Sequence, residues 1–264
     1  MSDLPFGPAT GLAGKTVQEH SAETDFKMFG MWFCPFVQRT WIALELKKLP
    51  YQYIEINAYN KSKELLEVNP RGLVPAIRQG DWAIYESMVT LDYLEDISPD
   101  SYPLFPKDPK KRAEARLWAE FAASKVFPAF QHFLQAQEPE EQDEYAADLT
   151  AGLKTLVQAA DKEGPFFQGS QIGWVDVSFA PWVLRLRRVL KPYCNWPDAD
   201  KVDFGDAALT ARWAKWVDAI ENNDAVKRTT SEDVAYLRAY RRYAENRPNT
   251  SQLADAINKG KPLP

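Results

Sequence analysis

The pattern of hydrophobic and polar positions changes character near residue 100. Before this point, short apolar or alternating runs are interleaved with segments whose apolar residues recur every three or four positions. After it, the helical spacing dominates. The pattern therefore predicts an α/β unit followed by an all-helical unit.

The first half is predicted to have the element order β-α-β-α-β-β-α. The expected strands are residues 26–32, 51–56, 74–78 and 81–84. The expected helices are residues 37–48, 61–68 and 86–97. Gln79 and Gly80 are typical of a hairpin turn between the last two strands.

The segment 98–109 contains four prolines and is predicted to be the linker between two domains. We expect residues 1–24 to form a flexible polar arm, 25–97 the first domain and 110–264 an all-helical domain. The helical domain should begin with a long helix over 110–137, kinked at Pro128. The acidic stretch 138–148 is interpreted as a solvated connection leading into the next helix. Further helices are expected over residues 145–162, 175–189, 206–220 and 231–245.

Composition excludes several classes of function. The formal net charge of -5 argues against a general nucleic-acid binder, which would carry a basic stripe. No apolar run reaches the roughly 18 residues of a membrane span, and the N-terminal region has no signal-peptide pattern. Two cysteines make no disulfide framework, so we expect a reducing, cytoplasmic compartment. Two histidines without ligand spacing predict no metal site.

Cys34 is the first candidate for chemistry, because it stands directly before Pro35 at the predicted start of a helix. Proline favours the first helical position, which makes Cys34 the N-cap. The free amides and the positive end of the helix dipole there stabilise a thiolate, the nucleophilic form of cysteine. Position alone leaves open that Cys34 is a buried structural residue. Cys194 is interpreted as structural.

Three more signals surround the cysteine. Val37, three residues on, is not a second cysteine, so a reactive Cys34 needs a partner thiol from outside the chain. Pro75 within LVPAI indicates either a strand edge or a cis bond that turns the Val74 backbone toward a ligand. In YES, Ser87 is either a plain helix cap or a donor to a carboxylate, and Glu86 beside it is able to accept from an ammonium group.

Taken together, the stretches WFCPFVQR, NPRGLVPAI and YESMVTLDYLED resemble cytosolic glutathione transferases, in particular the omega class and its fungal branch. The resemblance implies a thioredoxin-like N-terminal domain with a mixed sheet, a helical glutathione-transferase C-terminal domain and a homodimer. It implies that Cys34 is the catalytic thiol. The glutathione-binding residues it implies are Phe36, Lys61 for the glycyl carboxylate, Val74 with a cis Pro75 for the cysteinyl backbone, and Glu86 and Ser87 for the γ-glutamyl end.

From this resemblance we expect a thioltransferase that uses glutathione as co-substrate and no metal. Residues 28–33 contain no hydroxyl group, which favours the cysteine-using class over those that use tyrosine or serine. The alternative is a non-catalytic binder of hydrophobic or aromatic molecules on the same scaffold. The segment GWVD departs from the family pattern, because Gly173 replaces a capping Ser or Thr, yet Asp176 should still reach back to start a helix.

An apolar acceptor site is the last expectation. Aromatic residues recur at helical spacing near Phe127 and Phe130 and again near Tyr236. Such stripes belong to the core more often than to a pocket. Because the family folds a C-terminal helix toward its active site, these three residues are also candidates for contacting a hydrophobic or aromatic small-molecule partner.

Overall fold

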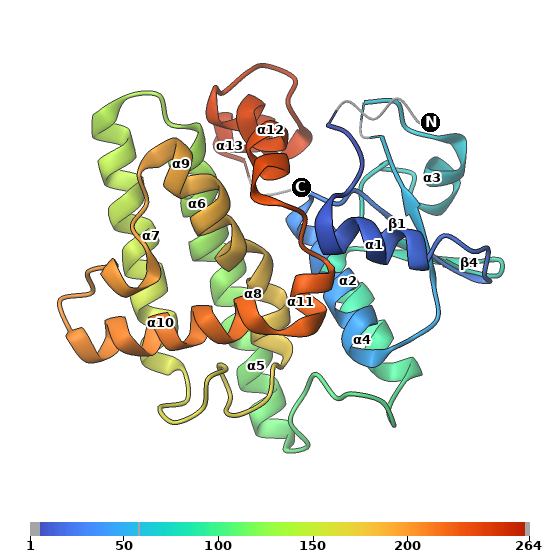
Figure 1. The fold of residues 1–264 in the computed structure, drawn as a ribbon, viewed down its shortest axis with the longest axis horizontal. Helices are drawn as coiled ribbons and strands as arrows, with labels where there is room; N and C mark the ends of the chain where they lie inside the picture. The colour runs from blue at the N-terminus through green and yellow to red at the C-terminus, as the bar shows by residue number, and fades with distance from the viewer. Residues whose placement is uncertain (1–5, 58, 262–264) are drawn as a thin grey trace. The chain divides into compact units, whose positions relative to one another are not determined.

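The structure, a computed structural model, describes residues 6–57 and 59–261 and divides into two compact units. The first runs to Leu104 and also includes Asn222–Ala235, and the second comprises Phe105–Glu221 and the chain from Tyr236 onward. The boundary between Leu104 and Phe105 falls within residues 98–109 (Figure 1). However, a stretch of some dozen residues from the C-terminal half belongs to the first unit.

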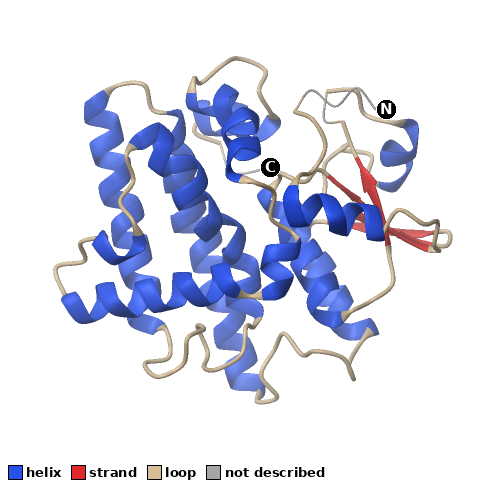
Figure 2. Cartoon of the chain, in the orientation of Figure 1, coloured by secondary structure: helices blue, strands red, loops and turns tan. Residues whose placement is uncertain are grey.

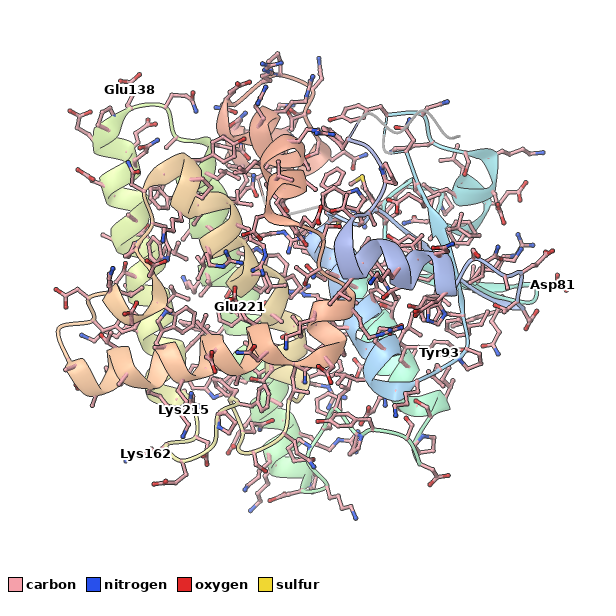
Figure 3. The ribbon with its side chains drawn as sticks, viewed as in Figure 1. Asp81, Tyr93, Glu138, Lys162, Lys215 and Glu221 are labelled. Carbon is pink, nitrogen blue, oxygen red and sulfur yellow. The ribbon has the colours of Figure 1, made fainter. Side chains whose placement is uncertain are left out.

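The first unit is built on one four-stranded sheet in the order β2-β1-β3-β4. Its strands are β1 (Phe26–Gly30), β2 (Gln52–Glu55), β3 (Ala76–Gln79) and β4 (Trp82–Tyr85). β1 pairs with β2 in parallel, whereas β3 is antiparallel to both β1 and β4. Asp81 lies at the tip of the β3–β4 hairpin (Figure 3). This mixed sheet, with its crossover helix between β1 and β2, confirms the thioredoxin-like fold.

Helices cover both faces of the sheet. The first unit contains α1 (Gly11–Glu19), α2 (Pro35–Lys47), α3 (Lys63–Val68), α4 (Ser87–Ile97) and α11 (Asp224–Arg228). Met28 and Phe29, neighbours on β1, are both fully buried although they point to opposite faces. On one face Phe29 packs with Leu65 of α3 and Ala76. α2 and α4 pack together, and the hydroxyls of Thr40 and Thr90 lie 2.7 Å apart between them.

The expectation of a flexible N-terminal arm differs from the structure. Residues 1–5 lie outside the described part of the chain, but Gly11–Glu19 form the helix α1. This helix packs against α11. Thr10 fastens the junction, because its amide donates to Ser231 Oγ at 3.1 Å and its hydroxyl accepts from the Glu232 amide at 3.0 Å. The segment 222–235 therefore holds the N-terminal helix in place.

The proline-rich segment is anchored to the first unit by one buried ion pair. Lys47 Nζ lies 2.7 Å from Glu95 Oε2, and the lysine side chain is fully buried. Lys47 also donates to the Tyr102 carbonyl at 2.9 Å, and Glu95 accepts from the Leu104 amide at 3.1 Å. These bonds give hydrogen-bond partners to backbone groups of the segment 98–109, whose prolines disfavour helix and strand.

The second unit is helical, and among the described residues the strands lie in the first unit (Figure 2). Its longer helices are α5 (Pro109–Phe121), α6 (Phe127–Gln135), α7 (Pro139–Ala159), α8 (Trp174–Arg185) and all but the last residue of α10 (Ala207–Asn222). The helix α12 (Asp233–Ala244) belongs to this unit from Tyr236 onward. Shorter helices are α9 (Lys191–Cys194) and α13 (Gln252–Asn258). The acidic stretch expected as a connection is instead the first part of α7, with Glu138 as its N-cap residue (Figure 3). Acidic side chains favour a helix N-terminus, so this charge stabilises the helix.

Two π-helical segments precede prolines that lie inside helical stretches. Residues Ala122–Val126 widen before Pro128, and Leu186–Leu190 widen before Pro192. In each, the next amide donates five residues back, from Phe127 to Ala122 and from Lys191 to Leu186. The wider turn removes the clash between a proline ring and the carbonyl four residues earlier. The predicted irregularity at Pro128 is thus present.

The helix expected at GWVD begins as predicted, with Gly173 as the N-cap and Asp176 reaching back to its amide at 2.8 Å. Asp176 Oδ1 also accepts from the Phe167 amide at 2.9 Å and from Trp216 Nε1 at 2.6 Å. Burial raises the pKa of Asp176 to about 6 despite these donors. Within residues 6–57 and 59–261, none of the helices combines the length and the apolar character of a membrane span.

Candidate active site

Cys34 is the N-cap of α2, as the sequence predicts, and Pro35 is the first helical residue. Cys34 is half-buried. β1 ends at Gly30, and the residues 31–33 lead from it to the cysteine. The Cys34 amide donates to the Met31 carbonyl at 2.9 Å, which closes this turn. The position places the sulfur at the positive end of a 13-residue helix.

The Val74–Pro75 peptide bond is cis, as the resemblance implies. Pro75 is buried and stands immediately before β3, so it removes no donor from the sheet ladder. Val74 is partly exposed, and its carbonyl oxygen lies 4.0 Å from Cys34 Sγ. The Val74 backbone is thus available beside the thiol, in the arrangement that suits pairing with an extended peptide.

Glu86 and Ser87 form the start of α4, although their roles at the helix end differ from the expectation. Glu86, not Ser87, is the N-cap residue, and its φ of 73° lies in the left-handed region that non-glycine residues seldom adopt. Such backbone strain is typical of functional sites. The Glu86 carboxylate is exposed and accepts from Arg71 Nη1 at 2.5 Å. Ser87 is the first helical residue and is buried.

Lys61 lies just before α3 and donates from Nζ to the Arg71 carbonyl at 3.3 Å. Its side chain passes over Gly72, where a Cβ would lie 2.6 Å from Lys61 Cδ and 2.9 Å from Nζ. Gly72 also has a φ of +62°. Arg71 thus binds Glu86 through its side chain and Lys61 through its carbonyl oxygen. It therefore links the Lys61 ammonium group to the Glu86 carboxylate.

Arg39 is a site residue that the sequence interpretation missed. It is only 3% exposed, and its Nη1 donates to Ser87 Oγ at 3.0 Å. Its guanidinium lies 5.3 Å from the centre of the Phe36 ring. Burial lowers the pKa of Arg39 to about 9, and the negative charge of Cys34 opposes that effect. The signal available in the sequence was a cation within the first turns of the helix that follows the cysteine, between the apolar residues Val37 and Trp41.

Seven of the predicted site residues belong to the first unit, namely Cys34, Phe36, Lys61, Val74, Pro75, Glu86 and Ser87. These residues offer a thiol at a helix N-terminus, a backbone edge beside it, a carboxylate, a hydroxyl and an amine. Such groups suit a peptide-like thiol that has both acidic and basic ends. Among the described residues, no group of three or more His, Cys, Asp or Glu side chains is placed to hold a metal ion.

The three candidates for an apolar acceptor site belong to the second unit, and all are buried. Phe127 stacks on Trp182 with ring centres 3.6 Å apart. Tyr236 lies 5.2 Å from the Arg185 guanidinium. Their burial favours the alternative that the aromatic stripe belongs to the core, and Phe130 is likewise 2% exposed. Their contact with an acceptor stays a prediction.

Comparisons with known proteins agree with this geometry. The family described as "Glutathione S-transferase, N-terminal domain" matches residues 33–97. Glutathione S-transferase U17 of Arabidopsis thaliana is 35% identical over 214 residues, which cover 78% of this chain and 90% of that protein. The crystal structure of glutathione transferase Omega 3C from Trametes versicolor superimposes with a TM-score of 0.81 at 41% identity, covering 90% of this chain and 98% of that one. Rice GST1 in complex with glutathione superimposes with a TM-score of 0.70 at 26% identity, covering 81% and 96%.

Proposed function

This chain belongs to the glutathione S-transferase family, and from that premise we propose that it is an omega-like, glutathione-dependent thioltransferase that removes glutathione from small-molecule or protein conjugates. The observation that carries the proposal is a half-buried cysteine at the N-cap of α2. A thiolate at this position attacks sulfur, whereas a hydroxyl group would only stabilise the thiolate of glutathione. The similarity to the Omega 3C enzyme supports the subtype.

The residues around Cys34 have distinct roles in holding glutathione. Lys61 neutralises the glycyl carboxylate, and the Val74 backbone pairs with the cysteinyl residue. Ser87 and the amides at the start of α4 bind the γ-glutamyl carboxylate. Glu86 accepts from the γ-glutamyl ammonium, which then replaces Arg71 as its partner. Phe36 flanks the tripeptide.

The proposed reaction is a pair of thiol–disulfide exchanges. The Cys34 thiolate attacks the glutathione sulfur of a mixed disulfide, and the S–S bond to the acceptor breaks. The acceptor leaves as a thiolate and takes a proton from solvent. A second glutathione thiolate then attacks the glutathione sulfur on Cys34, which yields glutathione disulfide and regenerates the Cys34 thiolate. In the net reaction, the mixed disulfide and one glutathione thiol give the acceptor thiol and glutathione disulfide.

Replacing Cys34 by serine tests the proposal. We expect thioltransferase activity toward a glutathione mixed disulfide to fall to background, because serine forms no mixed disulfide. Cys194→Ser is the matched control, since burial raises the pKa of that thiol to about 12 and leaves it unreactive. Full activity in the Cys34→Ser variant would rule out the proposed mechanism.

The alternative function is a non-catalytic binder on the same scaffold. The alkylation rate of Cys34 by iodoacetamide, followed against pH, separates the two. A midpoint well below the ordinary thiol value of about 8.5 supports the nucleophile, and an ordinary midpoint supports the binder. We also propose a homodimer, supported by the exposed apolar side chains of Trp82 and Val89 on the first unit. Sedimentation equilibrium measures its mass directly.

A further inference from the structure

Residues 6–10 form an N-terminal segment that lies against the loop between β1 and α2. The Phe6 ring meets the Phe33 ring edge-on, with ring centres 4.8 Å apart and an angle of 76° between the planes. The indole Nε1 of Trp32 donates to the Gly7 carbonyl at 3.1 Å. Two consecutive residues of the N-terminal segment thus hold two consecutive residues of the loop, one through an aromatic contact and the other through a hydrogen bond.

The two contacted side chains are buried and anchor the loop. Trp32 is 1% exposed and Phe33 is 4% exposed. Their own rings also meet edge-on, with centres 5.3 Å apart. The backbone of the loop has a separate attachment, because the Trp32 amide donates to Glu55 Oε1 at 3.1 Å at the end of β2. The loop is therefore fixed by the sheet through its backbone and by the N-terminal segment through its side chains.

The position of the thiol depends on this loop through the backbone. Phe33 directly precedes Cys34, and the Cys34 amide closes the turn by donating to the Met31 carbonyl at 2.9 Å. Cys34 is also the N-cap of α2, and its extended backbone, with φ -74° and ψ 123°, lets the helix begin at Pro35. A shift of the Phe33 ring is therefore transmitted within one residue to the sulfur.

The N-terminal segment is itself fixed on both sides of Gly7. Before it, the Phe6 ring also contacts the ring of Tyr59 on the loop after β2, with centres 5.7 Å apart. Gly7 has a φ of 74°, in the left-handed region that favours glycine. After it, the Thr10 amide donates to Ser231 Oγ at 3.1 Å. These attachments keep the segment in place against the loop.

We propose that Phe6 is a positioning residue for Cys34, which makes the N-terminal segment a functional part of the site. This inference deepens the proposed function and rests on Cys34 being its nucleophile. Without the Phe6 ring, the loop keeps its backbone bonds but loses the contact that holds Phe33. The sulfur then spends less time at the N-terminus of α2, where its thiolate is stabilised. Phe6 acts through Phe33 and takes no part in the disulfide exchange itself.

Hydrogen exchange of the Trp32 and Cys34 amides, measured by NMR without glutathione, tests the hold on the loop. Phe6→Ala should speed the exchange of both amides by about twofold to tenfold, the factor that corresponds to the loss of one aromatic pair. Phe6→Tyr keeps a ring of the same size and should restore slow exchange. Leu12→Ala, at an exposed residue of α1, is the matched control and should leave both amides unaltered.

Steady-state kinetics test whether this hold serves the nucleophile. In Phe6→Ala, kcat for reduction of a glutathione mixed disulfide should fall by about twofold to tenfold, in step with the faster exchange. KM for glutathione should change less, because the residues proposed to bind glutathione lie outside the loop. Phe6→Tyr should keep the kcat of the unsubstituted protein.

Three results would overturn the proposal. One is unchanged exchange at the two loop amides in Phe6→Ala, and another is faster exchange with an unaltered kcat. The third is an equal acceleration of exchange at the amides of α4, because it would show a general loss of stability of the first unit. Failure of the proposed function would appear differently, as absent turnover in the unsubstituted protein, so the two failures are distinguishable.

Discussion

Replacing Glu45 by glutamine should destabilise the first unit, because this carboxylate of α2 joins segments that are far apart in sequence. Its Oε1 lies 3.2 Å from His20 Nε2 and accepts from the Tyr51 hydroxyl at 2.7 Å. Its Oε2 accepts from Arg228 Nε at 2.5 Å. The three partners lie just after α1, just before β2 and at the end of α11. The variant keeps the shape of the side chain and removes the charge.

The magnitude follows from the pKa of Glu45. Burial alone would raise it, but the bonds from His20, Tyr51 and Arg228 outweigh burial and lower it from 4.5 to about 2. A difference of that size corresponds to about 3 kcal/mol. The Arg228 side chain is 38% exposed, and solvent screening weakens its share, so we expect a loss of about 2 kcal/mol at neutral pH. Because the folded pKa is the lower one, this stabilisation is complete above the unfolded value of 4.5 and disappears as pH falls toward about 2.

Hydrogen exchange of the amides in α1, α2 and α11 measures the effect where it should occur. Urea unfolding alone would not isolate it, since two units need not unfold together. Glu45→Gln should speed exchange in these helices at pH 7, and the difference from the unsubstituted protein should shrink at about pH 3. Glu67→Gln on the exposed side of α3 is the control. An equal loss at both pH values would show that packing, and not the charge of Glu45, stabilises this junction.

Two further changes address the site itself. Arg39→Met should move the midpoint of Cys34 alkylation to higher pH by about one unit, because a buried cation no longer favours the thiolate. Arg39→Lys keeps a cation, so its midpoint should move less. An unmoved midpoint in the methionine variant contradicts this prediction. Gly72→Ala should raise KM for glutathione by about threefold to tenfold with kcat little changed, since the new Cβ displaces Lys61, a contact worth about 1 kcal/mol. Gly80→Ala carries similar backbone strain away from Lys61, with a φ of +57°, so equal KM values in the two glycine variants would refute the displacement.

Features fixed by neighbouring residues were predictable from the sequence. Cys34 before Pro35 specifies a helix N-cap through local sterics alone. The segment GWVD specifies a second helix N-terminus, because the Asp176 side chain accepts a hydrogen bond from the Gly173 amide only three residues earlier. The strands of the sheet were found to within a few residues for the same reason, since their apolar pattern is local.

Features that depend on distant contacts were not predictable. The segment Gly11–Glu19 has no long apolar stripe that would predict a helix. In the structure it is a helix that is held by contacts with α11 and Ser231, more than two hundred residues later in the chain. A single sequence gives no sign of such pairing. Arg39 was overlooked because charged residues are mostly exposed.

The placement of acids around Cys34 gives the site its chemical consistency. A thiolate needs donors and cations nearby, yet a site for glutathione also needs a carboxylate to meet an ammonium group. We propose that Glu86 meets that need from an exposed position, where Arg71 donates to its carboxylate. Desolvation of the Glu55 carboxyl group raises its pKa to about 8, so at neutral pH it keeps its proton. In the proposed mechanism the negative charge is carried by the sulfur, supported by the N-terminus of α2 and by Arg39.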